Sequence, residues 1–309
     1  MKIKRSVYPN FLIGGTAAGG TSFLSAILVQ HPQIYLPKLM RPEPHYFFKS
    51  WEYEKGVEQY LSRWFADVPE QAIAVGERSS SYLFGGKLVA EKVVKQYPEM
   101  KFIFTLRNPI ERTWANYRYT VLQGLEEYSF EDALKNEAQR VSNQSGMWAE
   151  IQPHNYTGRG LYASQLKQYL DIFPRENILL VKSELLSSQT DTELIKIYAF
   201  LGLTITNFAY NRVPDHTSTN VIDARLQMHL RKHFGSRFDL IIEATRKNLP
   251  VEDFVSNPDD RNKIEQLACN MTGGKVAMPQ AARDYLVRYF SQDMKELGEM
   301  VDFDISDWK

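Results

Sequence analysis

A glycine-rich segment near the N-terminus has the residue types of a phosphate-binding turn. An apolar run at residues 11–13 leads into this turn, and a helical pattern follows at 22–30. Backbone N–H groups in such a turn, together with the positive end of the following helix, bind anions without a dedicated cation. The segment therefore predicts a site for a phosphate or a phosphosulfate group.

The spacing from Gly14 to Thr21 fits the P-loop pattern G-x-x-x-x-G-K-[ST], except that Gly20 occupies the lysine position. That lysine normally grips the β- and γ-phosphates of a nucleoside triphosphate. A later predicted strand, at 101–106, ends in Arg107 and not in a magnesium-binding aspartate. Both features argue against a nucleotide or small-molecule kinase, which we keep as an alternative.

Two further segments carry side chains suited to anion binding and proton transfer. Arg107 follows a predicted strand at the sheet edge where ligands bind in open α/β folds, and it can hold a second phosphate bidentately. The alternative is a surface arginine that caps the next helix. Glu43 lies between two prolines beside aromatic residues, which suits a general base. Taken alone, Glu43 is more readily a surface carboxylate paired with Arg41 or Lys38, and His45 a structural histidine.

A third segment, Val75-Gly76-Glu77-Arg78-Ser79-Ser80-Ser81-Tyr82, passes from an apolar strand pattern into a hydroxyl-rich turn. Its simplest interpretation is a loop with a capping serine.

Elements that position these residues follow from the apolar pattern. Buried parallel strands are predicted at 11–13, 72–75, 101–106 and 177–181. Helices are predicted at 22–30, 56–64, 87–96, 109–122, 129–143, 163–173, 190–202 and 281–297, with Asn108 as an N-cap. This alternation predicts an α/β fold with a doubly wound parallel sheet. We expect a single domain over residues 1–309, with an insertion or lid at about 215–279, where the pattern is irregular.

Composition limits the partners. The 309 residues are 43% hydrophobic with a net charge of zero, so a global basic field for nucleic acid is absent. The single Cys269 and the scattered histidines show no metal-ligand spacing. No signal-peptide pattern and no stretch of ~18 apolar residues is seen. We expect a cytoplasmic protein without a transmembrane segment or a metal, acting on a small partner.

Taken in order, these segments resemble the sulfotransferases that use 3′-phosphoadenosine 5′-phosphosulfate (PAPS). The similarity is greatest to bacterial members akin to the heparan sulfate N- and O-sulfotransferase domains, and it covers nearly the whole chain. It implies the P-loop-like sulfotransferase fold. It also implies that Glu43, in E-x-H-[FY]-F, is the catalytic glutamate, oriented by His45, and that Arg78 lies near the sulfuryl group. Arg107, in R-[DN]-P-x-x-R, would bind the 3′-phosphate.

The resemblance implies further cofactor contacts from the turn, a helix and two later segments: Thr16, Ala17, Ala18, Gly19, Gly20, Thr21, Ser22, Ala115, Tyr162, Gly274 and Lys275. Two positions depart from the family pattern. Ala18 stands where the family has a lysine or arginine, and Ala115 where it has a serine. Candidates to replace the missing cation are Lys38, Arg41, Lys49 and Arg78, of which Arg78 is the first choice.

The expected function is transfer of a sulfuryl group from PAPS to a hydroxyl or amine, with Glu43 as general base. A catalytically impaired protein that binds PAPS, or its product adenosine 3′,5′-bisphosphate, is the main alternative, because both departures remove cofactor contacts. The acceptor can be a glycan, a lipid headgroup or another metabolite, and the sequence does not indicate an oligomeric state.

Overall fold

The computed structural model describes residues 8–37, 43–205, 207–211, 219–247 and 249–309. The chain divides into two compact units. The sheet unit comprises residues 1–112, 158–214 and 289–309, and the helical unit comprises 113–157 and 215–288. The roles predicted for the turn, Glu43, Arg78 and Arg107 all fall on the sheet unit.

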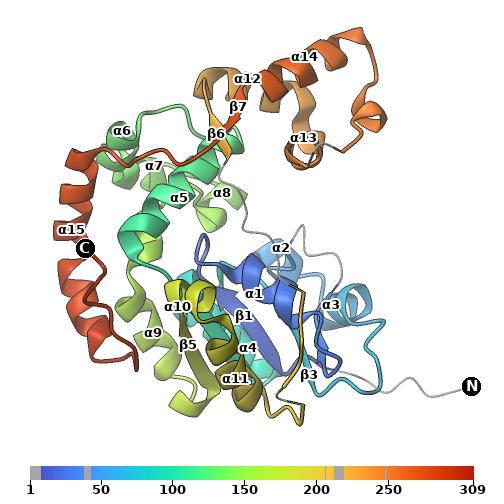
Figure 1. The fold of residues 1–309 in the computed structure, drawn as a ribbon, viewed down its shortest axis with the longest axis vertical. Coiled ribbons are helices and arrows are strands. Elements are labelled where there is room, and N and C mark those ends of the chain that lie inside the picture. The colour runs from blue at the N-terminus through green and yellow to red at the C-terminus, as the bar shows by residue number, and fades with distance from the viewer. Residues whose placement is uncertain (1–7, 38–42, 206, 212–218, 248) are drawn as a thin grey trace, which may run out of the picture. The chain divides into compact units, whose positions relative to one another are not determined.

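A five-stranded parallel sheet forms the centre of the sheet unit (Figure 1). Its order is β2-β3-β1-β4-β5, and every neighbouring pair is parallel. The strands are β1 (Phe11–Gly15), β2 (Ile34–Tyr35), β3 (Ala74–Arg78), β4 (Lys101–Leu106) and β5 (Ile178–Lys182). The predicted doubly wound parallel sheet is confirmed. Strand β2 was not predicted, because its two residues are too short for a periodic signal.

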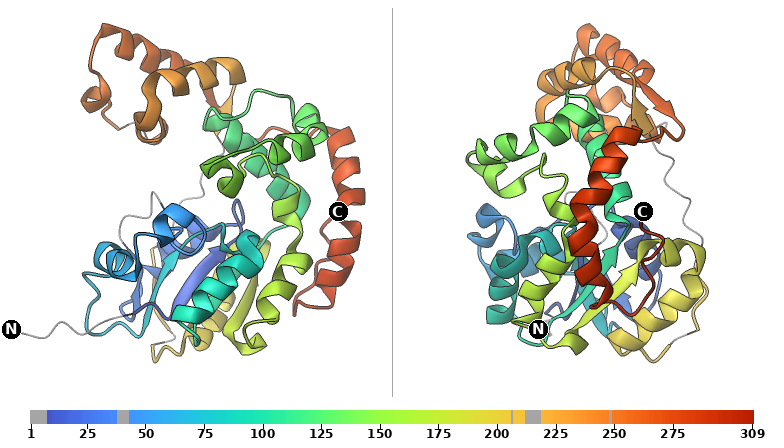
Figure 2. Two further views of the ribbon diagram at one scale, coloured as in Figure 1. Left: turned by 180° about the vertical axis from the view of Figure 1, so that it is seen from behind. Right: turned by 90° about the vertical axis from the view of Figure 1, so that its left-hand side faces the viewer.

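Helices cover both faces of this sheet. Successive side chains of β1 point to opposite faces and pack against different helices. Phe11 and Ile13 pack with α1 (Thr21–Leu28) and α11 (Thr190–Leu201) on one face. Leu12 joins a larger core on the other face. Helices α3 (Val57–Trp64), α4 (Tyr82–Gln96) and α9 (Tyr162–Leu170) contribute to that core, and the second face appears in Figure 2, left. Both faces of the strands are thus buried, as expected for a parallel sheet.

Strand β4 and helix α5 (Pro109–Leu122) have the predicted bounds. Asn108 caps α5, because its side-chain oxygen accepts a hydrogen bond of 2.9 Å from the backbone N–H of Ile110. A proline at the first helical position supports the same start.

Several predicted boundaries were wrong, and three of the differences are large. Strand β3 continues three residues beyond Val75, to Arg78, because Glu77 and Arg78 find buried polar partners that an apolar-run criterion does not register. Helix α4 starts at Tyr82, five residues before the predicted start, and contains a kink at Gly86. The predicted helix at 129–143 is two helices, α6 (Phe130–Lys135) and α7 (Glu137–Ser142).

The helical unit has a small core of its own, which includes Leu230, Phe238 and Leu267. Its later elements are α12 (Ala224–Phe234), α13 (Phe238–Arg246), α14 (Pro258–Cys269) and the antiparallel pair β6 (Thr219–Val221) and β7 (Met271–Gly273). Most of the predicted insertion at 215–279 therefore has regular structure. Its role as a lid stays a prediction.

Shorter elements complete the described chain: α2 (Ser50–Tyr53), α8 (Met147–Ile151), α10 (Ser183–Ser188) and 3₁₀ turns at Gly158–Gly160, Arg175–Asn177, Gly235–Arg237 and Glu252–Phe254. The last helix, α15 (Gln280–Gly298), begins in the helical unit and ends in the sheet unit. Within the described ranges, no helix has the length and apolar character needed to cross a membrane.

Candidate active site

The glycine-rich turn between β1 and α1 is held by backbone contacts. The Thr16 N–H and hydroxyl both donate to the carbonyl of Thr105, at 2.9 and 3.1 Å. The Gly19 N–H donates to the Thr16 carbonyl at 2.9 Å. A Cβ at Gly19 would lie 2.2 Å from the Thr16 hydroxyl, so only glycine fits there. Sequence and backbone together thus build a tight glycine turn, and its binding of an anion stays a prediction.

Gly20 explains why the P-loop lysine is absent. Its φ of 91° lies in the left-handed half of conformational space, which favours glycine. A Cβ there would also lie 3.0 Å from the hydroxyl of Ser183. A lysine at this position would be strained. The turn therefore disfavours the residue with which a kinase binds the β- and γ-phosphates.

Arg107 lies beside the turn, at the carboxyl end of β4. Its guanidinium donates to the carbonyl of Ala18 at 3.3 Å. The carbonyl of Arg107 accepts from the Tyr162 hydroxyl at 2.9 Å. The structure therefore brings Arg107, Tyr162 and the turn together, while their role in binding a cofactor stays a prediction. The helix-capping role belongs to Asn108 and not to Arg107.

Glu43 and Arg78 form a direct ion pair. Arg78 Nη1 lies 2.5 Å from Glu43 Oε1 and donates a hydrogen bond of 3.0 Å to the Ser22 hydroxyl, in the first turn of α1. The other carboxylate oxygen of Glu43 accepts from the N–H and the hydroxyl of Ser80, both at 2.8 Å. The same oxygen lies 3.1 Å from His45 Nε2.

This geometry bears on the interpretation of Glu43 as a surface carboxylate. The side chain is only 14% exposed and its partners come from β3 and the turn after it, so it is not a surface carboxylate. Lys38 and Arg41, the partners considered from sequence, lie outside the described residues. His45 points its Nε2 at the carboxylate, as an orienting residue would.

Charges and hydrogen bonds set the protonation of this pair. Burial raises the pKa of Glu43, but the hydrogen bond and charge of His45, the Arg78 guanidinium and the Ser80 N–H outweigh burial and lower this pKa to about 2. Burial lowers the pKa of His45, and the neighbouring Glu43 only partly opposes that shift. At neutral pH the site therefore holds an ionised carboxylate beside a neutral imidazole.

Three further cations belong to the sheet unit: Lys49, a sequence candidate for the missing cation, and Arg112 and Arg159, which sequence reasoning did not assign to the site. Arg112 is fully buried, and Arg159 is 7% exposed, with its guanidinium 4.2 Å from the ring of Phe84. Burial and the charge of Arg112 lower the pKa of Arg159 to about 9. Burial lowers the pKa of Lys49, and the charge of Glu43 opposes this. The site therefore has an excess of positive charge, which favours anionic ligands.

The other predicted cofactor-site residues are divided between the two units. Thr21 and Ser22 open α1, and Ala17 belongs to the turn. Ala115 lies on α5, while Gly274 and Lys275 follow β7, all three in the helical unit. The part of these last three in a cofactor site stays a prediction.

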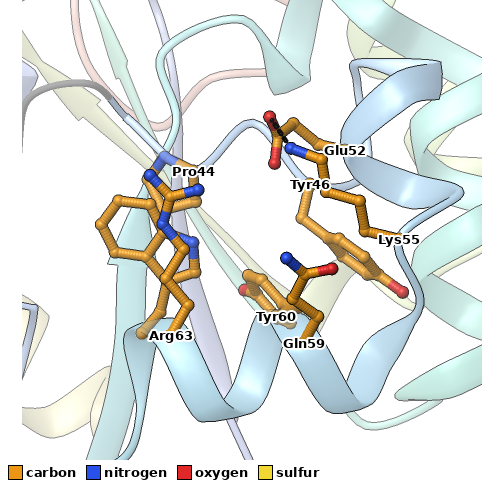
Figure 3. A pocket seen from close by; sticks show the side chains of 8 residues that line it. Pro44, Tyr46, Glu52, Lys55, Gln59, Tyr60 and Arg63 are labelled. Atoms are coloured by element: carbon orange, nitrogen blue, oxygen red, sulfur yellow. Dashed lines mark hydrogen bonds and ion pairs between the residues drawn. The ribbon is translucent and has the colours of Figure 1, made fainter.

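A small cavity lies beside the loop that carries Glu43 (Figure 3). It is lined by Pro44, Tyr46, Glu52, Lys55, Gln59, Tyr60, Arg63 and Trp64. Its volume of about 10 Å³ suffices for one water molecule at most. We therefore do not assign it to an acceptor. Within the described ranges, no group of three or more His, Cys, Asp or Glu side chains is arranged to hold a metal ion.

Comparison with known proteins agrees with this geometry. Residues 8–229 match the model of the sulfotransferase domain family. Mouse heparan sulfate glucosamine 3-O-sulfotransferase 3B1 is 29% identical over 199 residues, which cover 63% of this chain and 46% of the mouse protein. The human bifunctional heparan sulfate N-deacetylase/N-sulfotransferase 2 is 27% identical over 203 residues, covering 63% of this chain and 22% of that protein. The chain thus matches about half, or less, of the length of these relatives.

A solved structure supports the fold separately. The sulfotransferase from Alicyclobacillus acidocaldarius superposes with a TM-score of 0.67 at 24% identity, covering 98% of this chain and 99% of that one. The family match includes the glycine-rich turn, Glu43, Arg78 and Arg107. We conclude that the chain belongs to the sulfotransferase domain family.

Proposed function

We propose that this protein transfers a sulfuryl group from PAPS to a hydroxyl or amine of an acceptor. The observation that carries the proposal is the position of Arg78, whose Nη1 contacts both Glu43 and the first turn of α1. One guanidinium thus joins the anion-binding turn to a carboxylate that can accept a proton. Family membership supports the same activity.

The residues present suit the two anionic ends of PAPS. The turn and the start of α1 would hold the 5′-phosphosulfate, while Arg107 would bind the 3′-phosphate with Tyr162 behind it. Arg78 would supply the cation that Ala18 lacks. AMP has no 3′-phosphate for Arg107 to bind, so a site of this kind should prefer adenosine 3′,5′-bisphosphate to AMP.

In the proposed reaction the acceptor oxygen or nitrogen attacks sulfur in line with the bridging oxygen. The new bond to sulfur forms as the bond to the bridging oxygen breaks, and adenosine 3′,5′-bisphosphate leaves with the electron pair. Glu43 takes the acceptor proton, and Arg78 with the turn N–H groups stabilises the charge on the leaving phosphate. Positioning and charge stabilisation supply most of the catalysis, as in phosphoryl transfer.

The pKa of Glu43, about 2, describes a carboxylate that Arg78 still holds. A phosphosulfate beside Ser22 would compete with Glu43 for that guanidinium. The pKa of Glu43 would then rise, because one of the interactions that lower it is weakened. Glu43 would become a stronger base when the donor is in place.

The acceptor class is the least constrained part. The names of the related proteins mention heparan sulfate glucosamine, so a sugar hydroxyl or amine is the first acceptor to test. Lipid headgroups and hydroxylated metabolites complete the panel. The expected cytoplasmic location stays a prediction.

Ala18 and Ala115 favour a second candidate, a protein that binds the nucleotide but transfers no sulfuryl group. Calorimetric titration with adenosine 3′,5′-bisphosphate, beside AMP and ATP, tests both candidates at once. We expect micromolar binding that needs the 3′-phosphate and is lost in Arg107→Ala. Turnover of PAPS with the acceptor panel then separates an enzyme from a binder. Equal affinity for AMP would contradict both.

A further inference from the structure

Glu77 lies on β3, beside Arg78, and has no exposed surface. Its carboxylate accepts hydrogen bonds from the hydroxyls of Tyr82, Ser79 and Tyr60, at 2.6, 2.9 and 3.3 Å. These three described partners are neutral hydroxyls. A buried carboxylate held by hydroxyls costs free energy to keep charged, so its presence calls for an explanation.

Two of these hydroxyls also contact the backbone of the loop that carries Glu43. The Ser79 hydroxyl accepts from the N–H of His45 at 2.7 Å. The Tyr82 hydroxyl accepts from the N–H of Phe47 at 3.4 Å. A hydroxyl has one hydrogen, and here the hydrogen goes to the carboxylate, which leaves the lone pairs free to accept. The charge of Glu77 therefore sets the direction of both hydroxyls.

The loop needs such support at His45. This residue has a φ of 48°, in the left-handed region that side chains other than glycine rarely adopt. In this conformation its imidazole Nε2 lies 3.1 Å from the Glu43 carboxylate. The hydrogen bond from the His45 N–H to Ser79 is short and partly buried, so it opposes relaxation of the strained residue.

We propose that Glu77 is a positioning residue for the sulfuryl transfer inferred above, on which this inference rests. Its carboxylate fixes the hydroxyls of Ser79 and Tyr82, and these hold the backbone of residues 45–47. The loop then presents Glu43 and His45 to the acceptor. Glu77 itself touches neither substrate.

Protonation of Glu77 gives this role a pH signature. Burial raises the pKa of Glu77 to about 7, the charge of Glu43 adds to this rise, and hydrogen bonds from Tyr82, Ser79 and Tyr60 oppose it. The ionisable groups that face Glu77 are thus Glu43 from the loop, Tyr60 from α3 and Tyr82 from α4. A protonated Glu77 donates a hydrogen, so one hydroxyl must turn and can no longer accept from the loop in the same way.

The test compares Glu77→Gln with Tyr60→Phe, a matched control that removes one hydrogen bond to Glu77 without touching the loop backbone. In Glu77→Gln the amide donates toward the hydroxyls. We expect PAPS turnover, read as released adenosine 3′,5′-bisphosphate, to fall about 10- to 100-fold in kcat. KM for PAPS should stay unchanged. The rise of kcat through about pH 7 should disappear in Glu77→Gln and persist in Tyr60→Phe.

Hydrogen exchange of the peptide that covers residues 43–49 gives a readout independent of activity. It should be faster in Glu77→Gln and unchanged in Tyr60→Phe. Wild-type kcat with a wild-type pH profile in a folded Glu77→Gln protein would overturn the proposal, and so would unchanged exchange. Should Glu77→Gln not fold, Ser79→Ala carries the same test, with the same kcat loss and faster exchange expected.

Failure of the proposed function is seen separately. If the wild-type protein does not bind adenosine 3′,5′-bisphosphate, or binds it without any turnover of PAPS, the transfer reaction is wrong before any variant is measured. If the wild type turns over PAPS and Glu77→Gln does so equally well, only the positioning role is wrong.

Discussion

The glycine-rich turn and the loop around Glu43 lie in the same unit but are built in opposite ways. The turn from Gly14 to Gly20 contains no charged residue, and backbone hydrogen bonds to Thr105 hold it in place. The Glu43 loop is held by side chains from β3 and the turn that follows. In the proposed function, the first region would bind anions through its backbone, and the second would position a base through charge.

This difference suggests a source for the missing cation, which we propose is Arg78. In the sulfotransferase pattern that the sequence resembles, a lysine or arginine precedes the Gly-Gly-Thr at residues 19–21. Ala18 occupies that position here. The structure instead has Arg78 reaching Ser22 from the neighbouring strand. A charge absent from one region is thus available from the other. The predictions below test this division, from the largest expected effect to the smallest.

Glu43→Gln should have the largest effect. It keeps the shape of the loop and removes the base, so we expect PAPS turnover to fall by at least about 10³-fold, within the range of general acid–base catalysis. Binding of adenosine 3′,5′-bisphosphate should be retained, because the turn is unaffected. Glu52→Gln, which alters a carboxylate paired with Lys55, is the control. Near-normal turnover in Glu43→Gln would show that the base is wrongly assigned.

Arg78→Met should lower kcat by about 10²- to 10³-fold, as for loss of one preorganised charge-stabilising group. Adding Ala18→Lys to this variant should recover at least about 10-fold of that loss, because a cation returns to the turn. Lysine at this position adds no new Cβ strain. The matched control is Ala17→Lys in the same background. Equal rescue by both lysines would mean that only net charge matters.

Stability should depend on pH through Glu77. Its pKa in the folded protein, about 7, lies above the ordinary value of 4.5. The stability linked to this group is therefore fully present below pH 4.5 and is lost as pH rises through 7. Wild type should lose about 2 kcal/mol more than Glu77→Gln between pH 5 and pH 7 in urea unfolding. Parallel curves for the two proteins would contradict the raised pKa.

Ala18→Gly should have the smallest effect. The φ of Ala18 is 63°, which costs alanine about 1 to 2 kcal/mol, whereas glycine adopts it freely but loses about 0.5 to 1 kcal/mol in chain entropy. A net gain of about 0.5 kcal/mol in unfolding free energy is expected. Ala17→Gly, at a position without positive φ, should instead destabilise the protein. If both variants had a lower free energy of unfolding than wild type, Ala18 would not be strained in the turn.

Much of the sheet unit could be predicted because its signals are local. The apolar run of β4 and the Asn108-Pro109 start of α5 each lie within a few residues, so both elements have their predicted bounds. Strand β2 could not be predicted. Its two residues are extended because they pair with Ala74 and Val75, about 40 positions later in the sequence.

The candidate site was predictable only in part. Glu43, Arg78 and Arg107 came from the order of short motifs, and the structure brings Glu43 and Arg78 into contact although 35 positions separate them. Arg112 and Arg159 were not assigned to the site, because their burial depends on tertiary packing. Glu77 appeared to be part of a turn, since a charged residue in a strand is normally exposed.

The Arg78 guanidinium contacts both Glu43, the proposed base for the acceptor, and Ser22, beside the proposed donor site. This arrangement has a consequence for the order of substrate binding. In the proposed mechanism, an acceptor that arrived while Arg78 held Glu43 would meet a weaker base than after the donor had bound. Binding of the donor to Arg78 would strengthen the base. The proposal therefore predicts ordered addition, with the nucleotide entering first.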